Sequence, residues 1–186
     1  MMLAALLLMA PPAPMPAPGA PAVSIVQTRA ALAGRWTGKL EYRDYQADRW
    51  FGLPVTVTIE AVDTGRTLIR KAAFDDGPAT GTVWIVTTSL FDPASGREQS
   101  ASFRAGRAST LESTTIRLAS ATDAEHWTLI DERDGMDDDR PARIRETTVR
   151  DGATMVTVKE VDFTDDKSEA WLTRNRTTLV RDQATP

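Results

Sequence analysis

The sequence contains one histidine, His126, which stands between Glu125 and Trp127. An imidazole can serve as a general base or as a metal ligand at neutral pH. No Gly-x-Ser-x-Gly motif accompanies it, so the sequence marks no serine nucleophile to pair with it. We therefore expect His126 to lie at the surface or at one end of a strand, without a catalytic role.

Six carboxyl side chains lie in the segment DERDGMDDD, from Asp131 to Asp139. Hard cations such as Ca²⁺ bind several oxygen ligands of this kind. An EF-hand loop, however, has alternating acidic positions followed by Gly and a distal Glu, whereas here Gly135 precedes an uninterrupted aspartate run. We predict a solvated acidic hairpin loop and no metal site.

Aromatic and arginine side chains are the candidates for ligand binding. Inside a β-barrel the core and the ligand cavity share one lining, so rings in strands serve either packing or binding. Trp50 and Phe51 fall in a short predicted connection, where they could form a lid. Arginines inside strands either face solvent or point inward, where they must be paired. The predicted ligand-binding residues are Trp36, Tyr42, Trp50, Phe51, Trp84, Trp127, Arg174 and Arg176.

Short runs of alternating apolar and polar residues, each ended by Gly, Asp or Pro, position these side chains. They predict ten strands, over 34–45, 54–62, 67–74, 80–90, 98–104, 110–119, 126–133, 142–150, 155–163 and 170–181. A short helix is expected only within 24–32. Asp151-Gly152 reads as a two-residue hairpin turn that would place Arg143 opposite Glu160.

The connections between these strands are too short for crossover helices, so neighbouring strands must pair antiparallel. A meander of this many strands curls and closes. The sequence therefore predicts an all-β fold: an antiparallel up-and-down β-barrel of about ten strands with a short N-terminal helix. The first strand should pair with the last, which brings Trp36 close to Arg181 and Tyr42 close to Arg174.

Residues 1–22 carry no charge and begin with an apolar run, MLAALLLM, that suits a signal peptide. The Pro/Ala-rich stretch that follows ends in Ala20-Pro21-Ala22, a small-x-small cleavage pattern. We expect a signal peptide over 1–22, a linker and short helix over 23–33, and the barrel domain over 34–182. The predicted location is exported, either periplasmic or secreted. Without cysteine the chain forms no disulfide.

Leu32-Ala33-Gly34-Arg35-Trp36, at the start of the first strand, resembles the entry of the calycin superfamily, which includes the lipocalins. In that family the tryptophan closes one end of the barrel and an arginine of the last strand packs across it. The resemblance implies this role for Arg174, Arg176 or Arg181. Leu40 to Tyr45 also resembles uncharacterised bacterial lipocalin-like proteins. Haem-binding barrels of the nitrobindin kind also begin with Gly-x-Trp, but this chain lacks their histidine near the C-terminus.

The formal net charge of −4, with both signs interspersed, argues against nucleic acid as a partner. The first expectation is a non-enzymatic, cofactor-free barrel that binds a small, partly apolar molecule in an internal cavity. One alternative is a protein of the cell envelope that binds a partner or acts as an inhibitor through its loops. A second is an isomerase or cyclase, which requires convergent carboxyl groups of shifted pKa inside the cavity. Strand parity further predicts an acidic mouth around Trp50 and Phe51, and no transmembrane segment is expected in the mature chain.

Overall fold

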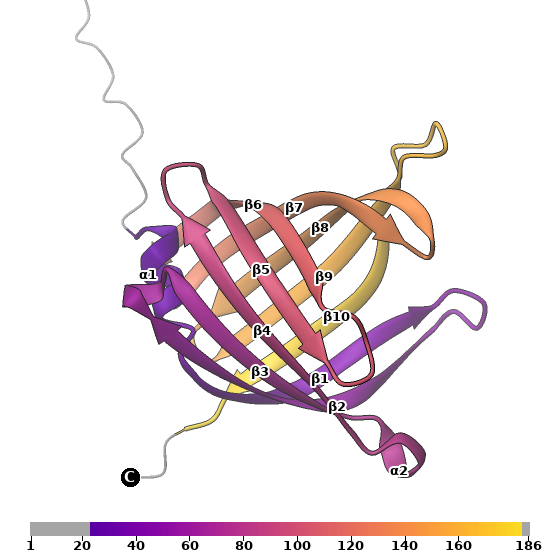
Figure 1. The fold of residues 1–186 in the computed structure, drawn as a ribbon, viewed down its shortest axis with the longest axis horizontal. Helices are drawn as coiled ribbons and strands as arrows, with labels where there is room; N and C mark the ends of the chain where they lie inside the picture. Colours follow the sequence, from indigo (N-terminus) through magenta and orange to yellow (C-terminus); the bar gives the residue numbers. More distant parts are fainter. Residues whose placement is uncertain (1–22, 184–186) are drawn as a thin grey trace, which may run out of the picture.

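The computed structural model describes residues 23–183 as one closed antiparallel barrel of ten strands, preceded by a short helix (Figure 1). The helix α1 (Ile25–Ala30) begins at Ser24, whose side chain accepts a hydrogen bond from the Gln27 N–H in a capping box. The strands are β1 (Gly34–Asp44), β2 (Arg49–Val62), β3 (Thr67–Asp75), β4 (Thr82–Asp92), β5 (Arg97–Arg104), β6 (Thr110–Asp123), β7 (His126–Asp137), β8 (Arg140–Asp151), β9 (Thr154–Phe163) and β10 (Leu172–Arg181). Two single turns, η1 (Asp63–Gly65) and α2 (Gly77–Thr80), complete the elements.

Each strand pairs with its neighbours in sequence, and β1 pairs with β10 to close the barrel. The closing register runs from Trp36 opposite Arg181 to Tyr42 opposite Asn175, which confirms the predicted closure. Gly38 permits the close approach of the two strands, because a Cβ atom there would lie 1.9 Å from the carbonyl oxygen of Thr178.

The apolar core fills the end of the barrel at which α1 lies. Side chains of alternating residues point inward, and the buried ones include Val57, Ile59, Leu68, Phe91, Ile116, Trp127, Leu129, Met155 and Leu179. Residues of α1 and the segment after it pack against this cluster, so the helix closes that end of the barrel. The interior at this end is therefore mostly apolar, with Arg29 of α1 buried against Phe91.

Trp36 is fully buried at this closed end, and its Nε1 donates to the carbonyl oxygen of Leu32 over 2.9 Å. The guanidinium groups of Arg181 and Arg150 lie 5.5 and 5.4 Å from its ring centroid. The resemblance at Gly34-Arg35-Trp36 implied one arginine of the last strand, and of the three candidates Arg181 lies against the ring. Arg150 of β8 is a second cation against the same ring, and its position could not be predicted from the chain ends.

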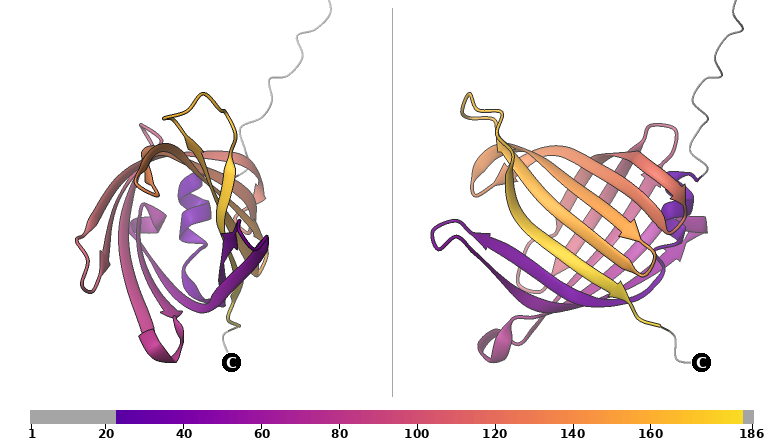
Figure 2. Two further views of the ribbon diagram at one scale, coloured as in Figure 1. Left: turned by 90° about the vertical axis from the view of Figure 1, so that its right-hand side faces the viewer. Right: turned by 180° about the vertical axis from the view of Figure 1, so that it is seen from behind.

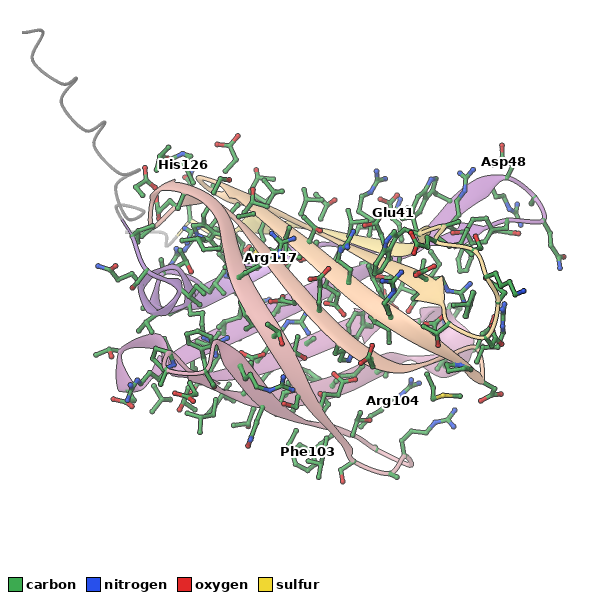
Figure 3. All side chains as sticks on the ribbon, turned by 90° about the horizontal axis from the view of Figure 1, so that it is seen from above. Glu41, Asp48, Phe103, Arg104, Arg117 and His126 are labelled. Carbon is green, nitrogen blue, oxygen red and sulfur yellow. The ribbon has the colours of Figure 1, made fainter. Side chains whose placement is uncertain are left out.

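The opposite end of the barrel is open. The hairpins β1–β2 and β7–β8 and the connection from β9 to β10 extend from it, and in Figure 2 (left) α1 is seen across the interior at the far end. Figure 3 shows His126 at the α1 end and Asp48 at the tip of the β1–β2 hairpin, at the open end. Among the described residues, none of the helices has the length and apolar character needed to cross a membrane.

Three expectations about connections need correction. β2 begins at Arg49, so Trp50 and Phe51 lie in a strand and not in a loop. β7 and β8 continue to a two-residue turn at Asp138-Asp139, where both residues have positive φ, as a type I′ hairpin requires. The turn between β8 and β9 is Gly152-Ala153, one position later than predicted, so Arg143 lies opposite Asp162.

Candidate ligand-binding cavity

A cavity of about 550 Å³ lies inside the barrel, between the apolar base and the open end. This volume falls within the range of about 300 to 1,000 Å³ found for small-molecule sites. Trp127, Leu129 and Met155 line its base. The cavity wall also carries hydroxyl, amide and charged side chains, of which Arg29, Ser89 and Glu98 lie at the closed end beside Phe91. The others are Arg70, Thr87, Ser100, Ser102, Glu112, Asp131, Glu146, Thr148, Thr157, Asn175 and Thr177.

Nearer the mouth, the wall formed by β1 to β4 is mostly apolar. There a pocket of about 320 Å³ is lined by Leu40, Tyr42, Phe51, Leu53, Phe74, Asp76, Val83, Ile85 and Arg104. The rings of Tyr42 and Phe51 are stacked, with centroids 5.5 Å apart. The pocket shares Leu40, Phe74 and Ile85 with the central cavity, so the two volumes adjoin. An apolar surface therefore leads from the mouth to the polar belt.

Two of the four cavity carboxyl groups have an arginine partner. Glu98 is paired with Arg29 of α1, which also donates to the Ser89 hydroxyl over 3.1 Å. Glu112 accepts a hydrogen bond of 2.8 Å from Arg133. These pairs neutralise their own part of the wall.

The other two carboxyl groups, those of Asp131 and Glu146, face each other. They are directly opposite in the β7–β8 register, and both line the cavity. Side chains opposite each other in an antiparallel pair have Cβ atoms about 4.5 to 5.5 Å apart. Burial and the negative charge of Glu146 raise the pKa of Asp131 to about 8. At pH 7 the Asp131 carboxyl is therefore mostly protonated.

Asp131 and Arg70 are two ionisable groups near Glu146. Within residues 23–183, Oδ1 of Asp131 is excluded from solvent and has no hydrogen-bond partner. Burial lowers the pKa of Arg70, while the negative charge of Glu146 acts in the opposite direction. Arg70 thus acts on Glu146 through its charge alone, and Arg29 and Arg133, which are bonded to Glu98 and Glu112, act on Asp131 in the same way.

Four of the eight predicted ligand-binding residues lie at the cavity or its mouth. Trp127 lines the base, and Tyr42 and Phe51 line the mouth pocket. Arg174 also lies at the open end, where its Nε is 2.8 Å from the Asp137 carboxylate. Trp36 is buried beneath the base and does not line the cavity.

The remaining three predicted residues lie on the outer face, which corrects their assignment to the cavity. Trp84 is 58% exposed, because its neighbours Val83 and Ile85 take the inward positions of β4. Trp50 points away from Phe51 and packs against the guanidinium groups of Arg43 and Arg176, 5.6 and 5.0 Å from its ring centroid. Arg176 also binds Glu41 on the outer surface, with a distance of 2.7 Å. The alternation of inward and outward residues along each strand was predicted, but which residues face inward was not.

The expected acidic mouth is largely compensated by basic side chains. The Asp137 carboxylate lies 2.7 Å from Nζ of Lys159 and 2.8 Å from Nε of Arg174. Arg140 bonds to both Asp165 and Asp166. The carboxylates do gather at the open end with the β1–β2 hairpin, as predicted, and five of the nine predicted there form ion pairs: Asp48, Asp137, Asp138, Asp165 and Asp166.

His126 lies on the outside at the closed end, with its ring nitrogens 2.9 Å from Asp123 and 3.5 Å from Asp151. The pKa of Asp123 is lowered, first by the backbone N–H of Glu125 and then by the His126 ring. This placement agrees with the expected surface role. Among the described residues, no group of three or more potential metal ligands is arranged to hold an ion.

Asp131 was assigned to a solvated acidic loop and Glu146 was given no role, although the sequence contains a signal for both. Asp131 follows Trp127 and Leu129 at a spacing of two, so it occupies the inward face of a strand whose preceding inward residues are core. Glu146 follows Ile144, and Arg70 follows Leu68, in the same way. A charged residue in phase with core residues marks an inward charge.

No protein-family model and no curated protein matches the chain. Among solved structures it is similar to the crystal structure of Rv2717c from M. tuberculosis, with a TM-score of 0.57 and 13% identity over 87% of this chain and 99% of that chain. A protein of unknown function from the DUF3598 family of Nostoc punctiforme matches with a TM-score of 0.26 and 9% identity, over 86% of this chain and 100% of that chain. At 13% identity the likeness to Rv2717c concerns the fold alone, and the ten-stranded barrel fits a lipocalin-like fold.

Proposed function

We propose that this barrel binds a small, partly apolar ligand in its internal cavity. The observation that supports it is the cavity of about 550 Å³, which adjoins an apolar pocket at the open end. A barrel without a ligand role could fill this space with side chains. Here the apolar packing stops at the base, and polar side chains surround a space above it.

The lining determines the kind of ligand. An apolar moiety would pack on Tyr42, Phe51 and Phe74, while polar groups of the ligand would meet the hydroxyl and carboxyl groups of the belt. Sites for small molecules commonly combine a mostly apolar wall with a few placed polar groups. An amphipathic molecule would satisfy both parts of this lining.

The uncharged fluorophore N-phenyl-1-naphthylamine tests this proposal, because its emission rises in apolar surroundings. Ser100 lines the cavity, and its neighbour Gln99 faces outward on the same strand. We expect the dye to bind wild-type protein and the Gln99→Trp variant, and to lose binding in Ser100→Trp, where the indole fills the cavity. Equal dye binding by the two variants, both folded by circular dichroism, would argue against an internal site.

A loop-mediated interaction protein is less well supported. That alternative requires Trp50 and Phe51 to be presented together to a partner. Trp50 is instead half-buried on the outer wall between arginines, and Phe51 faces the mouth pocket on the other side of β2.

A second candidate function, an acid–base enzyme such as an isomerase or cyclase, is favoured by one observation. Asp131 and Glu146 face each other in the cavity, and the raised pKa of Asp131 makes it a proton donor near neutral pH. The test is to incubate the purified protein with the molecules that co-purify and to follow them by proton NMR. Conversion to an isomer that ceases in Asp131→Asn would support an enzyme, and unchanged molecules would support a binding protein.

A further inference from the structure

The charged groups of the cavity do not balance. Four carboxyl groups line it, those of Glu98, Glu112, Asp131 and Glu146, and three guanidinium groups act on them, two through ion pairs and that of Arg70 through its charge alone. Arg29 pairs with Glu98, Arg133 pairs with Glu112, and Arg70 interacts with Glu146. One carboxyl group, that of Asp131, is in excess.

The carboxyl group in excess points into the cavity. Asp131 lines the cavity opposite Glu146, and its Oδ1 lacks a hydrogen-bond partner within the described residues. Lys159 lies opposite Glu146 on β9 but donates to Asp137 at the mouth, over 2.7 Å, while Arg29 and Arg133, whose charges act on Asp131, are bonded to Glu98 and Glu112. No described basic side chain is therefore bonded to Asp131.

A buried carboxyl group without a cation must either hold a proton or receive a cation from a ligand. With this proton Asp131 is neutral and the belt is balanced, and a ligand with a single positive charge can replace the proton and keep that balance. An anionic ligand cannot replace it, and a neutral ligand leaves the proton in place. The apolar wall of Tyr42, Phe51 and Phe74 lies between this belt and solvent, where it would cover the remainder of such a ligand.

We propose that the cavity selects a small organic monocation, an amine with an apolar substituent, whose ammonium group binds between Asp131 and Glu146. This inference rests on the proposed ligand-binding function and specifies its ligand class. The ammonium donates hydrogen bonds to the two facing carboxyl groups, and the substituent extends toward the mouth pocket. Binding displaces the proton that Asp131 otherwise holds.

A matched set of three compounds tests the ligand class: 2-phenylethylamine, 2-phenylethanol and phenylacetate, which share one apolar group and differ in charge. Calorimetric titration at pH 7 should show the amine binding about tenfold more tightly than the alcohol, and the carboxylate more weakly than both. In Asp131→Asn the preference for the amine over the alcohol should disappear. Glu132→Gln is the matched control, because Glu132 adjoins Asp131 on β7 and faces outward toward Arg145; it should retain the preference.

Proton release gives a second readout that a merely structural role of Asp131 would not change. Titration of the amine in phosphate and in Tris buffer should reveal release of about one proton per amine bound at pH 7 in the wild type, and none in Asp131→Asn. Equal affinity for amine and alcohol, or an amine preference retained in Asp131→Asn, would overturn the inference. So would binding of N-phenyl-1-naphthylamine without binding of the amine, which leaves the cavity function intact. If the dye also fails to bind, the proposed function itself is wrong.

Discussion

Asp131 on β7 lies directly opposite Glu146 on β8, and both residues line the cavity. The two carboxyl groups come from the middle of a hairpin whose turn, Asp138-Asp139, has the acidic residues that the sequence placed in a loop. The turn sets the register, and the register brings the two carboxyl groups together. The acidic hairpin thus contributes to the interior through its strands and not through its tip.

The position of Asp131 opposite Glu146 makes the stability of the fold depend on pH. The pKa of Asp131 is raised to about 8 in the folded protein, and an unfolded aspartate titrates near a pKa of about 3.9. The folded state therefore holds a proton that the unfolded state has lost between these values. This contribution to stability is fully present below about pH 4 and is lost as the pH rises through about 8.

We accordingly expect the free energy of unfolding to fall by roughly 2 to 4 kcal/mol between pH 5 and pH 8 because of this group. Urea denaturation at a series of pH values measures it, with Asp131→Asn as the comparison. The variant should show a flatter dependence over this interval. Parallel curves for the wild type and the variant would contradict the raised pKa.

Sequence patterns predicted the architecture because alternation and turn residues are local. Ten strands, their antiparallel order and the closure of Trp36 on Arg181 follow from them. The facing of Trp50 and Trp84 did not follow. Alternation requires only that neighbouring residues face opposite sides of the sheet, and it does not say which side is the interior. The register between β7 and β8 could not be predicted either. Only a turn placed at Asp138-Asp139 makes residue 131 face residue 146, and three consecutive aspartates do not by themselves indicate which two form it.

Arg150 should be the arginine on which the closed end depends most. Its side chain is fully buried, stacks on Trp36, and donates to the carbonyl oxygen of Ala31 over 2.7 Å and to that of Gly152 over 3.0 Å. Arg150→Met removes these donors, so the Ala31 carbonyl keeps only its hydrogen bond from Arg181 and the Gly152 carbonyl loses its side-chain donor. We expect a loss of about 2 to 4 kcal/mol in the free energy of unfolding.

The control is Arg35→Met, because Arg35 is 61% exposed and pairs with Asp182 at the surface of the same end. Its substitution should change the free energy of unfolding by less than about 0.5 kcal/mol. Chemical denaturation of both variants measures the difference. Similar losses in the two would mean that the buried contacts of Arg150 do not stabilise the closed end.

Adjacent residues on β2 offer a test of facing. Phe51 lines the mouth pocket beside Tyr42, while Trp50 packs on Arg43 and Arg176 outside. Phe51→Ala should weaken binding of N-phenyl-1-naphthylamine by about fivefold to tenfold through lost apolar contact, and Trp50→Ala should leave it within about twofold. Fluorescence titration of the two variants checks this. A larger effect of Trp50→Ala would place the binding surface on the outer wall.

Export predicts a specific mature mass. The predicted signal peptide, residues 1–22, lies outside the described residues, and the barrel begins at Gly34. Expression of the full chain in a bacterium with an active secretion pathway should yield a periplasmic protein that lacks these 22 residues. Intact-mass spectrometry of the periplasmic and cytoplasmic fractions measures it. Protein of full length found in the cytoplasm alone would refute export.

Native mass spectrometry tests the internal binding site most directly. Wild-type protein and the variants Gln99→Trp and Ser100→Trp are purified in parallel and analysed without denaturation. We predict a non-covalent mass adduct, released by organic solvent, on the wild type and on Gln99→Trp, whose new side chain lies outside. Ser100→Trp, folded but with its cavity filled, should carry none. The same adduct on Ser100→Trp at undiminished occupancy, or no adduct on any of the three proteins, would contradict a ligand held inside the barrel.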